Sequence, residues 1–318
     1  MSFSSNVKRE LCNHFGNARH CNIAELAGII NICGQIVKKD NSFCVKIQTE
    51  NFDVAKKCFT LLKKTFNIDI EIMVRRNSQF RNSRGYFIYI KNAVQAEKVL
   101  SATGILAFEE GNKVLIKRIY PLVISGACCK RAYIRGAFLS SGSITDPEKT
   151  YHLEFVNTEL DYCEQLKKLI GFFDIETKIV KRKDNYVLYI KEGELIVDLL
   201  NVMEAHIALM EFENIRIIKD MRNNLNRIVN CETANLGKIV AASVKQVEDI
   251  NYLMKNSDFS ELPESLKETA ELRVQYPDFS LKELGQMMKP PVGKSGVNHR
   301  LKKLGSMADA LREEKGDI

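Results

Sequence analysis

The chain lacks the features of membrane and secreted proteins. No apolar run approaches the roughly 18 residues that a membrane-spanning helix needs. The opening residues contain no apolar stretch of the kind that forms a secretory signal. The nine cysteines are odd in number and include no Cys-x-x-Cys pair. We therefore expect no membrane partner, a cytosolic location, and cysteines that are mostly reduced and buried.

The composition excludes a mainly disordered protein. Hydrophobic residues make up 45% of the chain and charged residues 27%, as in ordinary globular proteins. The 318 residues suffice for two or three domains. The formal net charge of +7 permits a polyanionic partner but does not require one. The distribution of the basic residues therefore matters more than their sum.

Four potential zinc ligands lie near the start of the chain, at Cys12, His14, His20 and Cys21. Zinc prefers thiolate and imidazole donors, so these residues could form a metal site. Their intervals are not those of a common zinc module, and the alternative is a terminal helix and turn with incidental Cys and His. The second interpretation is favoured, and the sequence predicts no metal and no cofactor.

Two stretches indicate an internal duplication. Residues 24–34 and 132–142 read AELAGIINICG and AYIRGAFLSSG, and Gly28 and Gly136 are 108 positions apart (136 − 28). Each stretch opens the same predicted order, helix–strand–strand–helix–strand–strand–helix. The matching segments are residues 36–37 and 143–144, 42–48 and 151–156, 52–66 and 160–173, 68–74 and 175–180, 86–90 and 186–190, and 93–100 and 195–203.

The glycines predict a close contact between the two opening helices. Gly28 and Gly34 in the first copy, and Gly136 and Gly142 in the second, remove Cβ atoms, so the two backbones can approach. A pseudo-twofold axis would then relate the copies, and two curved sheets would share one concave face. The alternative is two unrelated glycine-containing helices, which the matched downstream segments disfavour.

One family shares this glycine pattern. Residues 26–34 fit the nine-residue motif of the LAGLIDADG homing-endonuclease family, and residues 134–142 fit it loosely. The resemblance implies an α+β fold built from a duplicated LAGLIDADG-like α/β unit. In that family the eighth position is an acid that binds a divalent metal and supports phosphodiester cleavage. Here Cys33 and Ser141 occupy it, and neither can replace a carboxylate on Mg²⁺, so we predict that the protein is not an enzyme.

Two alternative functions stay open. Asp146, Glu148 and Glu50 are the nearest candidates for compensating acids, and with them the protein would be a metal-dependent endonuclease with rearranged ligands. The other alternative is a protein-interaction scaffold, in which the LAGLIDADG-like half docks a partner regulator.

Basic residues gather at equivalent places in the two copies, around the strands predicted from residues 68 and 175 and the turns after them. On one shared sheet face they would suit phosphate contact with some reach to base edges. The alternative is that they are solvated hairpin tips, and the sequence does not decide between the two. The candidates for DNA contact are Arg75, Arg76, Arg81 and Arg84 in the first copy, and Lys181, Arg182 and Lys183 in the second.

From about residue 214 onward the strand patterns stop and the chain predicts helices only. The first three span residues 214–228, about 233–255, and from Pro263 to about 276. Two short helices joined by a tight connection follow them. The apolar residues that predict their buried sides are Leu281, Leu284 and Met288 in the first, and Val297, Leu301 and Leu304 in the second.

The two short helices have the pattern of a helix-turn-helix. Ser280 and Glu283 have the spacing of a capping box, and Ser295 can cap the second helix. Residues 289–304 include five Lys or Arg and no acid. A basic second helix suits base reading in the major groove, with its N-terminus on phosphate, and the segregated charge disfavours a hairpin for protein contact. The candidates for DNA contact are Ser280, Lys282, Lys289, Lys294, Ser295, Asn298, His299, Arg300, Lys302 and Lys303.

A degenerate two-copy LAGLIDADG-like unit followed by a helix-turn-helix resembles the WhiA family of bacterial regulators. Residues 2–12, 130–139, 280–285 and 294–301 carry the resemblance. It implies a non-catalytic, sequence-specific DNA-binding transcription regulator, associated with the nucleoid, in a family that acts in sporulation, cell division and chromosome segregation. DNA contact in the family is attributed mainly to the C-terminal motif, here residues 280–304.

The sequence therefore predicts three segments. Residues 1–215 form a degenerate two-repeat LAGLIDADG-like domain with pseudo-twofold symmetry. Residues 216–232 are a helical linker, and residues 233–318 form an all-α helix-turn-helix DNA-binding domain. The expected partners are double-stranded DNA and, under the scaffold hypothesis, a partner transcription regulator.

Overall fold

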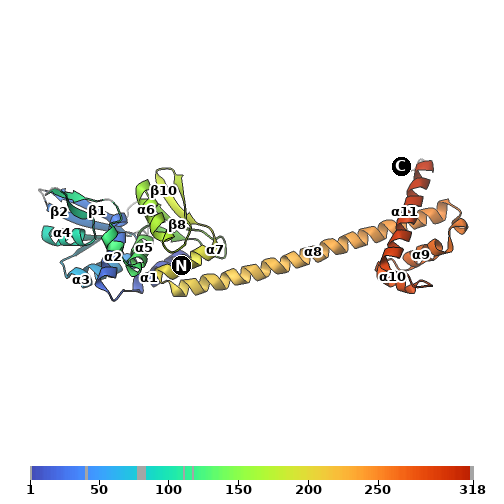
Figure 1. Cartoon of the computed structure of the whole chain (residues 1–318), viewed down its shortest axis with the longest axis horizontal. Coiled ribbons are helices and arrows are strands. Elements are labelled where there is room, and N and C mark those ends of the chain that lie inside the picture. Colours follow the sequence, from blue (N-terminus) through green and yellow to red (C-terminus); the bar gives the residue numbers. More distant parts are fainter. Residues whose placement is uncertain (1, 40–41, 77–83, 110–111, 117, 316–318) are drawn as a thin grey trace. The chain divides into compact units, whose positions relative to one another are not determined.

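The contacts within the chain divide it into two compact units, Met1–Asp220 and Met221–Ile318. Helix α8 (His206–Asn256) begins in the first unit and ends in the second. Among the described residues, no helix combines the length and the apolar character needed to cross a bilayer. The residues that the computed structural model describes are 2–39, 42–76, 84–109, 112–116 and 118–315 (Figure 1).

The first unit contains the two predicted copies, and the predicted order of elements is confirmed. A short helix, α1, lies ahead of the first copy at Phe3–Asn13. The first copy consists of α2 (Arg19–Cys33), β1 (Gly34–Lys39), β2 (Ser42–Thr49), α3 (Phe52–Phe66), β3 (Glu71–Arg76), β4 (Arg84–Ile90) and α4 (Ala93–Ala102). The second consists of α5 (Ala127–Ser141), β7 (Gly142–Ile144), β8 (Leu153–Asn157), α6 (Leu160–Gly171), β9 (Lys178–Arg182), β10 (Asn185–Ile190) and α7 (Gly193–Met203).

Each copy forms a four-stranded antiparallel sheet with the same topology. The strand orders are β1-β2-β4-β3 and β7-β8-β10-β9. The pairing is equivalent as well, since Val45 faces Ile90 in the first sheet and Leu153 faces Ile190 in the second. Side chains of α3 and α4 pack on the buried face of the first sheet, and those of α6 and α7 on that of the second. Each sheet therefore has one face against a core and one outer face.

Two strands begin later than the sequence predicted. β3 begins at Glu71 and β9 at Lys178, whereas the apolar pattern starts at Ile68 and Ile175. Both isoleucines are only 2% exposed and enter the core just ahead of the strand, which extended the apparent pattern. A hairpin and a single helical turn that the sequence pattern did not predict lie between the copies, at β5 (Leu106–Glu109), β6 (Asn112–Leu115) and η1 (Pro121–Ile124).

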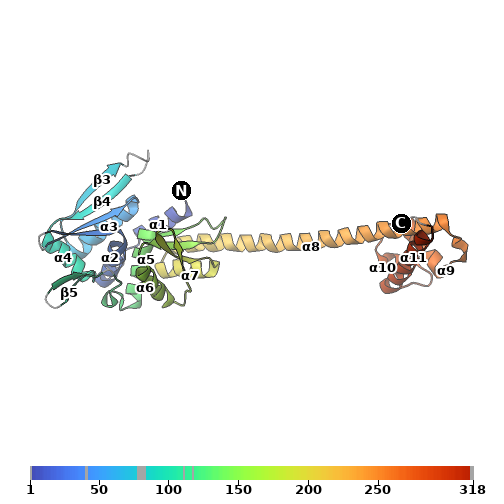
Figure 2. The same ribbon diagram turned by 90° about the horizontal axis from the view of Figure 1, so that it is seen from above.

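The predicted glycine contact between α2 and α5 is confirmed, and the two helices lie side by side at the centre of the first unit (Figure 2). A Cβ atom at Gly28 would lie 2.6 Å from the carbonyl oxygen of Tyr133. One at Gly136 would overlap the carbonyl oxygen of Glu25. Only glycine allows the backbones this close, because any side chain would push the two copies apart.

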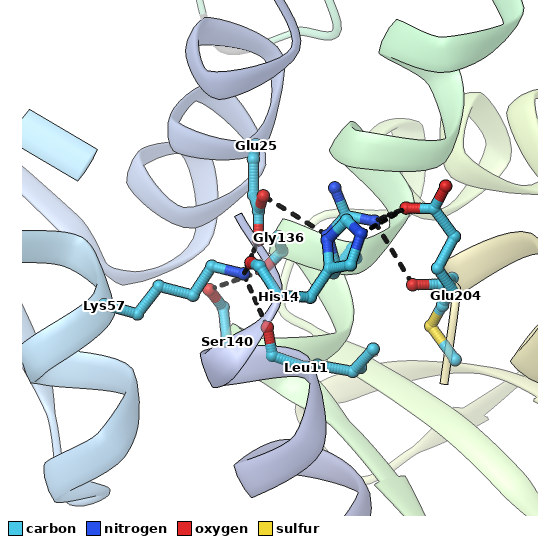
Figure 3. Close-up of polar contacts among 9 residues, drawn as sticks. Leu11, His14, Glu25, Lys57, Gly136, Ser140 and Glu204 are labelled. Carbon is cyan, nitrogen blue, oxygen red and sulfur yellow. Dashed lines mark hydrogen bonds and ion pairs between the residues drawn. The ribbon is translucent and has the colours of Figure 1, made fainter. Parts of the chain in front are cut away.

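A set of buried charges surrounds this contact (Figure 3). The side chains of Glu25 on α2 and Lys57 on α3 are fully buried, and Lys57 Nζ lies 2.5 Å from Glu25 Oε1. Arg135 on α5, whose side chain is 2% exposed, places its Nε 3.2 Å from Glu25 Oε2. Burial lowers the pKa of Lys57, and the charge of Glu25 opposes that shift. Each buried charge thus has a partner of opposite sign, which offsets the cost of removing it from water.

The same network reaches α1 and α7. Lys57 Nζ donates hydrogen bonds to the carbonyl oxygens of Leu11 at 2.6 Å and His14 at 2.7 Å. Arg135 Nη1 lies 2.5 Å from Glu204 Oε2, and His14 Nε2 lies 3.2 Å from the same oxygen. Burial, followed by the charge of Arg135, lowers the pKa of His14. Five helices of the first unit therefore meet through one connected set of polar contacts.

The second unit is helical, and its first helix is longer than predicted. Residues 214–255 lie in the single helix α8, rather than in two helices separated near residue 230. Residues 229–232 contain neither Pro nor Gly, so nothing there interrupts the helix. The end of α8 packs with three further helices around a core that includes Ile250, Leu266 and Leu301. These helices are α9 (Glu264–Gln275), α10 (Leu281–Met287) and α11 (Lys294–Lys315), and the turn η2 (Phe259–Glu261) precedes them.

We expect Gly136→Ala to lower the free energy of unfolding by about 3 kcal/mol or more, because the new methyl group has no space between α5 and α2. Gly171→Ala in α6 is the matched control, since a Cβ there meets no atom within 4 Å. It should change the free energy by less than about 1 kcal/mol. Denaturant titration of the full chain measures the free energy of unfolding of both variants. Equal unfolding midpoints would contradict the close backbone contact between α2 and α5 at Gly136.

Glu25→Gln should lower the free energy of unfolding by about 3–5 kcal/mol, because it leaves Lys57 buried without a counter-charge and removes one of the two acidic partners of Arg135. Glu71→Gln is the surface control, since the Lys91–Glu71 pair has the same 2.5 Å separation but more than 60% of each side chain is exposed. It should cost less than about 1 kcal/mol. The same denaturant titration compares the two variants. Equal decreases in the free energy of unfolding would mean that burial does not increase the contribution of the Glu25 ion pairs to stability.

Candidate nucleic-acid interface

The predicted capping box at the start of α10 is confirmed. The Ser280 hydroxyl accepts a hydrogen bond from the Glu283 N–H at 3.4 Å, and Glu283 Oε2 accepts one from the Ser280 N–H at 2.8 Å. Hydrogen bonding to Ser280, first through its side chain and then through its backbone, lowers the pKa of Glu283. The start of α10 is therefore defined by reciprocal side-chain and backbone contacts.

A buried arginine positions the turn that leads into α10. Arg273 on α9 is 3% exposed, and its Nη1 donates to the carbonyl oxygens of Pro277 at 3.1 Å and Phe279 at 2.8 Å. Burial lowers its pKa. Both carbonyl groups thus gain a charged donor, which orients α10 against α9.

The connection between α10 and α11 is held against α10 at a glycine. The Val292 N–H donates to the Gly285 carbonyl oxygen at 2.8 Å, and a Cβ atom at Gly285 would overlap the Val292 carbonyl oxygen. This close approach sets where α11 begins. The six residues 288–293 between the helices therefore form a compact turn, which keeps the two helices of the motif together.

Helix α11 has the two sides that the sequence predicted. Val297, Leu301 and Leu304 are at most 3% exposed and belong to the core of the second unit. The exposed side consists of polar and basic residues, and Asn298 between them is half-buried. The candidate residues exposed on this helix are Lys294, Ser295, His299, Lys302 and Lys303, and those exposed ahead of it are Ser280, Lys282 and Lys289.

Two details of the predicted motif are wrong. Ser295 does not precede α11, because the helix already begins at Lys294, so it is not the N-cap residue. Arg300 is half-buried, and its Nη1 donates to the Ser265 carbonyl oxygen at 3.3 Å and lies 3.6 Å from Met288 Sδ. The guanidinium therefore fastens α11 to α9, rather than projecting into solvent with the neighbouring lysines.

The basic residues of the sheets do not share one face. Successive side chains of a strand point to opposite sides, and Met73, Arg75 and Phe87 lie on the outer face of the first sheet. Arg84, in register with Arg76, lies on the opposite side. In the second sheet the same alternation separates Arg182 from Lys181, and Lys183 lies in the turn with a positive φ of 54°. Arg81 and the side chain of Arg76 lie outside the described residues.

Two acids that were not among the predicted site residues lie on the outer faces of the two sheets. Glu71 pairs with Lys91 at 2.5 Å in the first sheet. In the second, Glu154 Oε2 lies 3.0 Å from His152 Nε2 and 3.8 Å from Arg182 Nη1. The sequence does contain a signal for them, because alternate side chains of a strand point to the same face, and this alternation assigns both acids to the outer face. They reduce the positive charge that the faces present to a phosphate backbone.

The positions that carry metal-binding acids in the nucleases hold neutral groups. The Cys33 thiol lies 3.9 Å from the Ser140 carbonyl oxygen, and burial raises its pKa, so it stays protonated at neutral pH. The Ser141 hydroxyl donates to the Ala137 carbonyl oxygen at 3.3 Å. Of the acids considered as substitutes, Asp146 accepts the Glu148 N–H at 3.0 Å in an exposed turn. A hydroxyl and a neutral thiol are poor ligands for Mg²⁺, so this site does not fit the metal of a nuclease.

The structure does not assemble the zinc set that the sequence suggested. Cys12 is buried in the core of the first unit, and His14 contacts Glu204. His20 and Cys21 instead lie beside Cys128 and Cys129, with the four potential ligand atoms within 4.8 Å of one another. The repeat could have shown this, because His20 and Cys21 occupy the positions that Cys128 and Cys129 occupy in the second copy, 108 residues on.

Fold and site together define a class of protein: a duplicated LAGLIDADG-like unit without the paired acids of the nucleases, joined to a helix-turn-helix. Three family models match the chain, namely the WhiA N-terminal LAGLIDADG-like domain at residues 19–106, the WhiA LAGLIDADG-like domain at 130–222 and the WhiA C-terminal HTH domain at 225–308. The chain belongs to the WhiA family.

Similar proteins extend over the whole chain. A protein of Lachnoclostridium phytofermentans named probable cell division protein WhiA is 52% identical over 315 residues, covering 98% of this chain and 100% of the relative. One of Clostridium beijerinckii with the same name is 47% identical, with 99% and 100% covered. The crystal structure of full-length DUF199/WhiA from Thermatoga maritima is similar in fold, with 24% identity, a TM-score of 0.61, and 98% and 99% covered.

Proposed function

We propose that this protein is a sequence-specific regulator that binds duplex DNA through α10 and α11 and does not cleave it. The observation that carries the proposal is the division of α11 into a buried apolar side and an exposed side with His299, Lys302 and Lys303. Polar and basic side chains on the exposed side of the second helix of a helix-turn-helix can reach base edges in the major groove. The matching HTH family model supports the same assignment.

Residues of α10, of the connection and of the first turn of α11 complete the proposed DNA-binding surface. Lys282 on α10 and Lys289 in the connection are exposed, and Lys294 and Ser295 lie in the first turn of α11. Ammonium groups and free N–H groups at a helix N-terminus are suited to phosphate oxygens. In this proposal these residues set the register on the duplex, and Asn298 and His299 supply the contacts to bases.

The sheets have a smaller part in this proposal. Each outer face carries at least one acid, Glu71 or Glu154. Because side chains alternate along a strand, some of the basic residues, such as Arg84, point to the opposite face. We therefore assign DNA recognition to residues 233–318, with 216–232 as the helical linker and 1–215 as the LAGLIDADG-like domain. The regulated process in the proposal is cell division, through transcription at the nucleoid, because curated relatives carry that name. A role in sporulation rests on the family resemblance alone.

Lys302→Ala combined with Lys303→Ala should weaken binding of the full chain to duplex DNA at low salt. Each lost phosphate contact should reduce the slope of log K against log salt by about 0.9. Fluorescence anisotropy of a labelled duplex at several salt concentrations measures both quantities. Lys167→Ala with Lys168→Ala is the control, since these neighbouring exposed lysines on α6 give the same change in charge.

The control separates local contact from net charge. If both double variants lose affinity equally, the effect is one of total charge. If the α11 variant binds as the unchanged protein does, the assignment of this helix fails.

The protein should leave supercoiled plasmid intact in Mg²⁺ or Mn²⁺, because Cys33 and Ser141 offer no anionic oxygen where the nucleases bind metal. Agarose electrophoresis after incubation with excess protein shows nicking or linearisation directly. Nicking that disappears in Asp146→Asn or Glu148→Gln would favour the endonuclease with rearranged ligands instead.

A further inference from the structure

We propose that His20, Cys21, Cys128 and Cys129 form a zinc site that joins the two copies at the N-terminal ends of α2 and α5. The potential ligand atoms of the four residues all lie within 4.8 Å of one another. His20 Nδ1 lies 3.1 Å from Cys129 Sγ and 3.4 Å from Cys21 Sγ. Tetrahedral zinc, with Zn–S near 2.3 Å and Zn–N near 2.0–2.1 Å, separates its ligand atoms by about 3.6–3.8 Å. The four side chains therefore need only small rotations to surround one ion.

The donor set selects the kind of metal. Three thiols and one imidazole are the Cys₃His combination of structural zinc sites, in which four protein ligands close the coordination shell. Mg²⁺ and Ca²⁺ prefer oxygen ligands, so this set discriminates against the ions that serve phosphodiester cleavage. A closed shell leaves no position for a water nucleophile. The proposed ion is therefore structural and has no part in hydrolysis.

The ion would be reachable from solvent, yet held by ordered backbone. Cys21 and Cys129 are buried, whereas His20 and Cys128 are exposed. Both pairs lie in the first turn of a helix, so the backbone that carries the four side chains is ordered by helical hydrogen bonds. The Gly126 backbone hydrogen-bonds to Cys129, an interaction that orients a sulfur ligand.

Symmetry indicates what the site does. His20 and Cys21 occupy the positions of Cys128 and Cys129 in the other copy, at the same interval of 108 residues that separates Gly28 from Gly136. Each copy thus contributes two ligands, and the ion would lie near the pseudo-twofold axis that relates the copies. It would tie α2 to α5 at the helix ends opposite Cys33 and Ser141, the positions where the nucleases hold their catalytic metal.

The test is the metal content of the full chain, purified under reducing conditions from zinc-supplemented cells without chelators. Elemental analysis after gel filtration should find one zinc ion per chain. Replacement by Co²⁺ should give the absorption of a tetrahedral thiolate complex. Cys21→Ser with Cys128→Ser should abolish both signals. Cys231→Ser, which removes the exposed thiol of α8, is the matched control and should retain them.

A second measurement does not depend on how the variants fold. A zinc chelator added to the unchanged protein should lower its melting temperature, and added Zn²⁺, but not Mg²⁺, should restore it. The proposal is overturned if the unchanged protein binds neither Zn²⁺ nor Co²⁺, or if the double variant binds them as well as the control does. A disulfide among these cysteines in the freshly purified, reduced protein would overturn it too.

Discussion

The first unit depends on a contact between two backbones that leaves no room for a side chain. At Gly28 and Gly136 a Cβ atom would meet the main chain of the opposite helix, so α2 and α5 can approach only as glycine-bearing helices. Each helix passes directly into the first strand of its copy, at Gly34 and at Gly142. The position of the two helices therefore sets the position of both sheets, and the pseudo-twofold arrangement follows from one short stretch of each copy.

The buried charges add selectivity to that contact. A paired ion in a protein interior contributes little net stability compared with an apolar replacement, but an unpaired one is costly. The carboxylate of Glu25 contacts both Lys57 on α3 and Arg135 on α5, and Arg135 also pairs with Glu204. Arrangements in which α2 and α5 meet in another register leave a charge without its partner. The glycines thus permit the close approach, and the ion pairs favour one version of it.

The same pair of helices carries different groups at its two ends. At the C-terminal ends, the neutral side chains of Cys33 and Ser141 hydrogen-bond to nearby backbone carbonyl groups. At the N-terminal ends, the four His and Cys side chains gather as donors for a different class of metal. In our proposal, contact with a nucleic acid belongs to the second unit, where the exposed basic helix α11 packs on a core of its own.

The sequence by itself determined the features that depend on neighbouring residues. The glycine frame, the repeated order of elements, the capping box of Ser280 and Glu283, and the absence of acids at Cys33 and Ser141 could all be read from short stretches. Periodicity also identified the buried side of α11 correctly. It did not show that residues 214–255 continue as one helix, since a break there depends on weak local preferences.

Only the tertiary structure decided which distant groups meet. It turned Arg300 toward α9, separated Arg75 from Arg84 across the sheet, and brought Cys128 and Cys129 to His20. Local patterns tell which side of a helix or strand is buried, but not which other element covers it. For His20, Cys128 and Cys129 that second choice follows from the contact of α2 and α5, which joins residues more than 100 positions apart and appears in no short window of sequence.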